Sequence, residues 1–260
     1  MDFFTINRRE NKGGAVTLYP NFLTKRSSDL MIKGKDFYAV WDEEKGLWSR
    51  DEYDVQRLVD AELAKAANET PESVNVAYML NFESNSWSQF RLYTQKLGDN
   101  AHPLDEKLIF SNQETTKKDY ATKKLPYPLS DGECPSWDIL LSTLYKPEDR
   151  RKIEWAIGSI VKGDSKHIQK FLVFYGPSGT GKSTILNIIQ RLFEGYIAMF
   201  DAKALGSNNN SFSTEVFKNN PLVAIQHDGD LSRIEDNTKL NSIISHEDMV
   251  VNEKFKASYT

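Results

Sequence analysis

The sequence predicts an α/β fold of the P-loop NTPase class, preceded by a smaller α+β domain. Three observations lead to this prediction. Residues 176–184 read GPSGTGKST, which matches the phosphate-binding pattern G-x-x-x-x-G-K-[ST]. The apolar run FLVFY precedes this segment at 171–175, and an amphipathic stretch follows it. From residue 135 onward, predicted helices alternate with short apolar strands, which is typical of a sheet covered by helices.

Each residue type in the glycine-rich loop has a physical role in holding phosphate. Glycine permits backbone angles and a close approach that a Cβ would block, so successive N–H groups can surround the phosphate oxygens. The helix that follows adds the positive end of its dipole. Lys182 supplies a positive charge for the β and γ phosphates, and Ser183 offers an oxygen to Mg²⁺. The predicted nucleotide-binding residues are Gly176, Pro177, Ser178, Gly179, Thr180, Gly181, Lys182, Ser183 and Thr184.

The segments on either side of the loop support its assignment. The run at 171–175 is apolar at every position, as expected of a strand covered on both faces in a parallel sheet. After the loop, apolar side chains recur at the spacing of one helix face. This stripe consists of Ile185, Ile188, Ile189, Leu192 and Phe193. Gly195 stands where a C-terminal helix cap is expected.

The composition indicates a folded, soluble chain with neither an internal disulfide nor a CxxC-type zinc site. The 260 residues are 39% hydrophobic and 12% aromatic, and 33 basic against 37 acidic residues give a net charge of −4. Binding to nucleic acid would therefore need a local basic surface. Neither a run of about 18 apolar residues nor a signal peptide is evident, so we expect a cytoplasmic protein that contacts no membrane. One cysteine, Cys134, excludes an internal disulfide, and the four histidines lack metal-ligand spacing.

The chain is predicted to contain two domains. An N-terminal α+β domain covers 1–115, a polar, lysine-rich and proline-containing linker covers 116–134, and the nucleotide-binding core covers 135–260. Within the first domain, 36–49 reads as a β-hairpin, followed by a helix with Ser49 and Glu52 as a capping box. Within the core, one helix begins at Ser136, and a second runs from Pro147 to Gly163. Aromatic side chains that pack in the core rather than stack on bases are expected at Trp41, Trp48, Trp87 and Phe90.

A working P-loop NTPase also needs carboxylates at the end of a neighbouring strand. The segment PLVAIQHDGDL supplies them, because the apolar residues 222–225 lead directly to Asp228 and Asp230. We assign Asp228 as the main acid, contacting Mg²⁺ directly or through water, and Asp230 as a residue that orients the attacking water. The two roles can be reversed. The alternative is that Asp-Gly-Asp is an ordinary acidic turn before the next helix.

The last residues, VVNEKFKASYT, place Lys254 and Lys256 on one face of an extended segment. On a hairpin that lines a pore, two such lysines would contact the phosphates of nucleic acid without reading its sequence. The alternative is a solvated strand face with no ligand.

Three segments together resemble a known family. GPSGTGKSTILNII, then FSTEVFKNNPLVAIQHDGDLSRIEDNTKLNSIIS, then HEDMVVNEKFK are similar to the superfamily 3 helicase core of phage primase-helicases, which is related to the poxvirus-type proteins. Upstream segments, including DFYAVWDEEKGLWSRDEYDVQRLVD, resemble the region that precedes this core in replication proteins of Gram-positive phages. The resemblance covers nearly the whole chain.

The resemblance implies an AAA+-like fold and an ATP-dependent DNA helicase. It implies ATP and Mg²⁺ as cofactors, a ring that is usually a hexamer, translocation on single-stranded DNA, and other replication proteins as partners, in the cytoplasm of the host. By position, Lys182 and Ser183 would be the Walker A pair, Asp228 with Asp230 the Walker B acids, and Lys254 and Lys256 the DNA-contacting residues. The sequence stops at Thr260, before the sensor asparagine and arginine finger of that family. We therefore expect a C-terminally incomplete core with weak or no hydrolysis.

Two other functions stay open at this point. The first is a nucleotide-binding interaction module that assembles with a replication protein, or interferes with it, without being a motor. The second is a small-molecule kinase that uses the same loop, which is disfavoured because no arginine-rich lid follows the loop.

Overall fold

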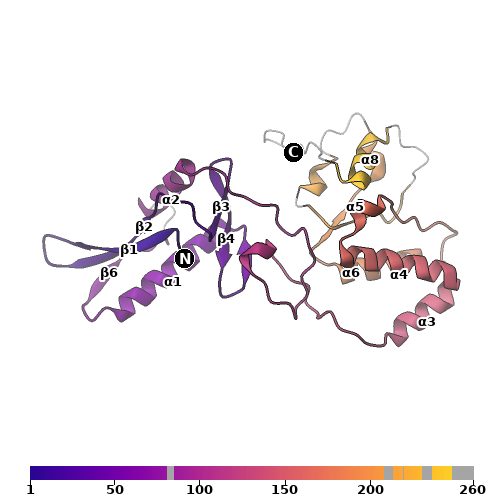
Figure 1. Cartoon of the computed structure of the whole chain (residues 1–260), viewed down its shortest axis with the longest axis horizontal. Coiled ribbons are helices and arrows are strands. Elements are labelled where there is room, and N and C mark those ends of the chain that lie inside the picture. Colours follow the sequence, from indigo (N-terminus) through magenta and orange to yellow (C-terminus); the bar gives the residue numbers. More distant parts are fainter. Residues whose placement is uncertain (81–84, 208–212, 219, 230–235, 248–260) are drawn as a thin grey trace. The chain divides into compact units, whose positions relative to one another are not determined.

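The chain folds into two compact units of mixed α/β structure (Figure 1). The computed structural model describes residues 1–80, 85–207, 213–218, 220–229 and 236–247. Unit 1 consists of Met1–Leu104 and Glu114–Lys123, and unit 2 consists of Asp105–Gln113 and Lys124–Thr260. The stretch 116–134, predicted as a linker, is thus divided between the two units at residue 123.

Unit 1 contains two three-stranded sheets. In the first, β1 (Phe4–Glu10) pairs antiparallel with β2 (Val16–Phe22), and β2 pairs parallel with β6 (Val74–Val76). In the second, β3 (Leu30–Lys33), β4 (Asp36–Asp42) and β5 (Leu47–Ser49) form an antiparallel meander. The hairpin predicted over 36–49 is therefore confirmed as β4 and β5.

Helices α1 (Glu52–Glu69) and α2 (Asn85–Lys96) pack on these strands and enclose the aromatic core of unit 1, which also contains the 3₁₀ turn η1 (Lys117–Asp119). Trp87 and Phe90 of α2 are fully buried. Trp41 and Trp48 pack edge to face on the second sheet, with ring centroids 5.6 Å apart. All four aromatic residues that the sequence offered as base-stacking candidates are core residues, because each has at most 5% of its surface exposed.

The N-terminal cap of α1 differs from the prediction. The capping residue is Asp51, whose carboxylate accepts a hydrogen bond from the Tyr53 backbone N–H at 2.9 Å. Ser49 belongs to β5, and its hydroxyl oxygen accepts from the Asp51 N–H at 3.1 Å. The capping-box prediction was wrong because strand β5 extends to Ser49. Asp51, the residue directly before the helix, instead accepts from one of the unpaired backbone N–H groups at the helix N-terminus.

In unit 2, a pair of helices precedes the glycine-rich loop. Its elements are α3 (Pro135–Leu144), α4 (Pro147–Lys162), α5 (Ser165–Ile168), α6 (Lys182–Leu192), β7 (Ile197–Met199), α7 (Ala202–Leu205), the 3₁₀ turn η2 (Glu215–Phe217), β8 (Val223–Ile225) and α8 (Thr238–Ser245). The prediction for α4 is confirmed at both ends, since Pro147 is its first residue and Gly163 caps it in the left-handed conformation with φ of 73°. Figure 1 shows α3, α4 and α6 in one part of the unit, and the core holds them together through Leu141, Ile153 and Ile185.

The short sheet of unit 2 is parallel. β7 pairs with β8 in the register Ile197 to Val223, Ala198 to Ala224 and Met199 to Ile225. β8 lies within the apolar strand predicted at 222–225. Ile225 faces inward onto Ile185 and Ile189 of α6, while Met199 is exposed. One face of this sheet is therefore packed against the helix that follows the loop.

The apolar run 171–175 does not form the predicted strand covered on both faces. No strand includes these residues, and Phe171, Leu172, Val173 and Tyr175 are 55%, 43%, 53% and 98% exposed. Only Phe174 faces the core. The prediction was wrong because a strand needs a neighbouring strand for its backbone hydrogen bonds, and apolar composition does not provide one. In the described part of unit 2, β7 and β8 pair with each other and neither pairs with residues 171–175.

Candidate nucleotide-binding site

The loop 176–184 has the backbone of a glycine-dependent turn followed directly by a helix. Gly176, Gly179 and Gly181 have φ of 152°, 80° and 80°, values that side-chain-bearing residues rarely adopt. Gly181 also serves as the N-cap of α6. Within the described residues, the amides of Gly179 and Gly181 donate no hydrogen bond. The loop is therefore shaped by its glycines, and two of its amides are available to a ligand.

The ammonium group of Lys182 lies inside the curve of this loop. Its Nζ donates hydrogen bonds to the carbonyl oxygens of Gly176 at 2.9 Å and Pro177 at 2.6 Å, and it lies 3.4 Å from the Thr180 hydroxyl. Thr180 in turn donates to the Pro177 carbonyl at 3.0 Å. The lysine charge is thus held at the centre of the loop by neutral carbonyls, so a phosphate group with its greater negative charge would compete strongly for it.

Helix α6 fixes the direction in which the loop presents these groups. Its first turn contains Lys182, Ser183 and Thr184, of which Ser183 and Thr184 are exposed. Its buried face, Ile185 and Ile189, packs on Ile225 of β8. Because the apolar face holds the helix against the sheet, the helix N-terminus and its unpaired N–H groups open toward the loop.

The end of helix α3 lies against both ends of the loop. At the C-terminal end of the loop, a Cβ built on Gly181 would lie 2.5 Å from Leu144 Cδ1. At the N-terminal end, the ring of Tyr145 packs edge to face on Phe174, with centroids 6.4 Å apart. Burial raises the pKa of the Tyr145 hydroxyl. This hydroxyl oxygen is buried, and it has no hydrogen-bond partner among the described residues.

Two aspartates follow the carboxyl ends of the parallel strands, Asp201 after β7 and Asp228 after β8. Gln226 connects them. Its Oε1 accepts from the Ala202 N–H at 3.1 Å, and its Nε2 lies 3.5 Å from Asp201 Oδ1 and 3.2 Å from the Asp228 carbonyl. Asp201 also caps α7 by accepting from the Lys203 N–H. The Asp228 side chain is exposed.

The segment after β8 contacts the later part of α6 rather than its first turn. The His227 Nε2 lies 3.3 Å from Gln190 Oε1, and Gln190 is eight residues, or about 12 Å of helix rise, beyond Lys182. Within the described residues, no hydrogen bond or ion pair joins the Asp228 carboxylate to the loop. Of the remaining candidates, Asp230, Lys254 and Lys256 lie outside the residues that the structure describes.

Several residues beside the loop or at the ends of the two strands were not found by sequence reasoning. Asp201 was readable, because it follows a short apolar strand as Asp228 does. The role of Gln226 could not be predicted, since a glutamine between a strand and an aspartate matches no known sequence motif. Leu144 and Tyr145 gave no signal either, because their contacts with Gly181 and Phe174 join residues 37 and 29 positions apart in the chain and arise only on folding.

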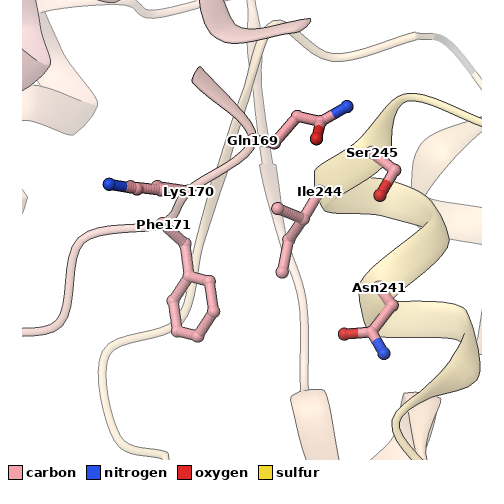
Figure 2. Close-up of a pocket in the computed structure, with 6 residues that line it drawn as sticks. All are labelled: Gln169, Lys170, Phe171, Asn241, Ile244 and Ser245. Carbon is pink, nitrogen blue, oxygen red and sulfur yellow. The ribbon is translucent and has the colours of Figure 1, made fainter. Parts of the chain in front are cut away.

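Unit 2 also has a cavity away from the loop. It has a volume of about 390 Å³ and is lined by Gln169, Lys170, Phe171, Asn241, Ile244 and Ser245. Figure 2 shows Asn241, Ile244 and Ser245 projecting from α8 beside the segment of Gln169 to Phe171. The cavity therefore adjoins the beginning of the exposed apolar run, and none of its lining residues belongs to the loop.

The described residues give no sign of a preformed metal cluster or of a membrane span. They include no group of three or more histidine, cysteine, aspartate or glutamate side chains placed to hold a metal ion. In the same residues, no helix combines the length and the apolar character needed to cross a bilayer.

Comparison with known proteins finds a similarity over the C-terminal third of this chain. Residues 174–260 match the family described as "Family of unknown function (DUF5906)". The match includes the loop, α6, both strands of the parallel sheet and α8. No curated protein matches the chain. The part that carries the candidate site is therefore similar to a family whose description assigns no function.

Proposed function

We propose that unit 2 binds the phosphates of ATP, with Mg²⁺, on the loop 176–184, and that it acts as an ATP-dependent DNA helicase module of a replication protein. One observation carries the nucleotide part of the proposal. Three glycines at positive φ shape a loop directly before a helix, and the Lys182 ammonium binds the Gly176 and Pro177 carbonyls of that loop. A cation, open amides and a helix N-terminus that converge on one point form an anion site suited to a polyphosphate.

The residues present fit a magnesium nucleotide. Lys182 would exchange its two carbonyl partners for oxygens of the β and γ phosphates, and the amides of Gly179 and Gly181 would donate to phosphate oxygens. The exposed hydroxyl of Ser183 would serve as an oxygen ligand for Mg²⁺, which prefers such hard ligands and supplies charge neutralisation during phosphoryl transfer. Asp228 would join the metal shell through water, with Asp230 orienting the attacking water or exchanging roles with it.

The motor part of the proposal rests on the sequence resemblance. Translocation along single-stranded DNA would use Lys254 and Lys256 for contacts with backbone phosphates, within a ring of subunits and together with other replication proteins. The net charge of −4 means that attraction to DNA would have to come from such a local basic surface. DNA binding should therefore weaken as salt concentration rises, with a slope set by the number of phosphates contacted.

The binding step is tested by calorimetric titration of the full chain with a non-hydrolysable Mg·ATP analogue. We expect saturable binding by the wild type and its loss in Lys182→Ala. Lys152→Ala is the matched control, because it removes an exposed lysine on α4 whose ion pairs with Glu148 and Asp149 lie at the surface. Equal affinity of the wild type and Lys182→Ala for the analogue would show that the loop 176–184 is not the binding site.

A second candidate function is a nucleotide-binding interaction module that is not a competent motor. Two observations favour it: the segment after β8 contacts Gln190 rather than the loop, and the apolar run 171–175 is exposed. ATP hydrolysis measured with and without single-stranded DNA separates the candidates. DNA-stimulated turnover supports the helicase, whereas nucleotide binding without turnover supports the interaction module.

A further inference from the structure

The end of helix α3 is placed to respond when the loop takes up a ligand. Leu144 touches the space beside Gly181, and Tyr145 packs on Phe174, two residues before the first glycine. These two consecutive residues thus contact the chain at both ends of the loop. These contacts give a change at either end of the loop a route to helix α3, because packed side chains transmit displacement.

Among the described residues, the Tyr145 hydroxyl lacks an acceptor, while two carbonyls of the loop have the Lys182 ammonium as a common donor. The Tyr145 hydroxyl is buried and has no partner in the described part of the chain. The carbonyl oxygens of Gly176 and Pro177 both accept from Lys182 Nζ. If the ammonium turns to a phosphate, the Pro177 carbonyl keeps the Thr180 hydroxyl as a donor, whereas the Gly176 carbonyl loses its donor. A buried hydroxyl without a partner is unfavourable, so pairing it with the Gly176 carbonyl would lower the free energy of the bound state.

We propose that Tyr145 is a positioning residue of the nucleotide site: its hydroxyl donates to a carbonyl of the loop when Lys182 engages phosphate, and thereby links loop occupancy to helix α3. This inference rests on the proposed binding of ATP to the loop. The hydroxyl does not touch the nucleotide. It stabilises the bound form of the loop by replacing the lysine as the carbonyl's donor, and it gains nothing while the loop is empty.

The test compares Tyr145→Phe with the wild type in two measurements on the full chain. The first is the thermal unfolding midpoint without ligand, and the second is the Kd for a non-hydrolysable Mg·ATP analogue. Because the hydroxyl has no partner in the empty state, Tyr145→Phe should leave the midpoint unchanged or raise it. Its Kd should rise about fivefold, which corresponds to about 1 kcal/mol, the scale of one hydrogen bond.

Tyr127→Phe is the matched control, because the Tyr127 hydroxyl already donates to the Leu192 carbonyl in the same unit. This variant should lower the unfolding midpoint and leave the Kd unchanged. The proposal is overturned if Tyr145→Phe binds with wild-type affinity, or if it lowers the midpoint of the free protein as Tyr127→Phe does. Absence of binding by the wild type itself would instead remove the proposed function, so the two failures are distinguishable.

Discussion

Leu144 occupies the space in which a side chain on Gly181 would begin. A Cβ at Gly181 would lie 2.5 Å from Leu144 Cδ1 and 3.0 Å from Leu144 Cδ2, well inside van der Waals contact. Gly181 also has φ of 80°. Two independent constraints therefore favour glycine at the last position before α6: the left-handed backbone angle and the Leu144 side chain at the end of α3.

Gly181→Ala should consequently destabilise unit 2. Left-handed φ costs an alanine about 1–2 kcal/mol, and displacing Leu144 adds to this, so we expect the free energy of unfolding to fall by about 1–3 kcal/mol. Urea denaturation measures the loss. In the background of Leu144→Ala the same substitution should cost less, because the contact is gone and only the backbone term remains. An equal cost in both backgrounds would contradict the packing argument.

Gly158→Ala should have the opposite effect on stability. Gly158 lies inside helix α4, and a Cβ built there meets no atom within 4 Å. Alanine is a better helix former than glycine, so the free energy of unfolding should rise by about 0.5–1 kcal/mol. The same denaturation experiment measures it, and nucleotide affinity should be unchanged. A destabilised Gly158→Ala would show that α4 is more closely covered than the structure indicates.

Asp2→Asn should reveal a pH-dependent contribution to the stability of unit 1. Partial burial opposes ionisation of Asp2, but hydrogen bonds from Ser27 and Ser28 outweigh it and lower the pKa of the carboxyl from 3.8 to about 2. A folded-state pKa below the unfolded value means stabilisation that is complete above about pH 4 and lost as the pH falls through about 2. At pH 7 we expect Asp2→Asn to reduce the free energy of unfolding by about 1–2 kcal/mol.

Chemical denaturation of both proteins between pH 7 and pH 2.5 checks this prediction. The difference between wild type and variant should shrink as the pH is lowered below 4. Asp36→Asn, an exposed substitution on β4, should stay within about 0.5 kcal/mol of the wild type at pH 7. A difference for Asp2→Asn that is constant over the whole range would rule out ionisation of this carboxyl as its source.

Local signals were sufficient to predict much of unit 2 from sequence. Helix α4 begins at Pro147 and is capped by Gly163, because proline at the first position and glycine past the last act within a single turn. The apolar stripe of α6 contains its two buried residues, Ile185 and Ile189. The loop between α6 and the apolar run has the three positive φ angles that its glycines suggested.

The remaining features depend on contacts between distant residues, which single-sequence patterns do not encode. The run 171–175 had the composition of a buried strand, yet pairing depends on which strand lies beside it. The N-cap of α1 is Asp51 rather than the predicted Ser49, because Ser49 is the last residue of strand β5. The contact of Leu144 with Gly181, which now explains the glycine, has no signature in either segment.

Hydrogen exchange of the loop amides tests most directly whether phosphate binds where we propose. The full chain is exchanged with and without a saturating non-hydrolysable Mg·ATP analogue, and the peptide that covers 176–184 is followed by mass spectrometry. The account predicts slower exchange in this peptide for the wild type and no change for Lys182→Ala. Saturated binding that leaves exchange of this peptide unchanged would contradict it.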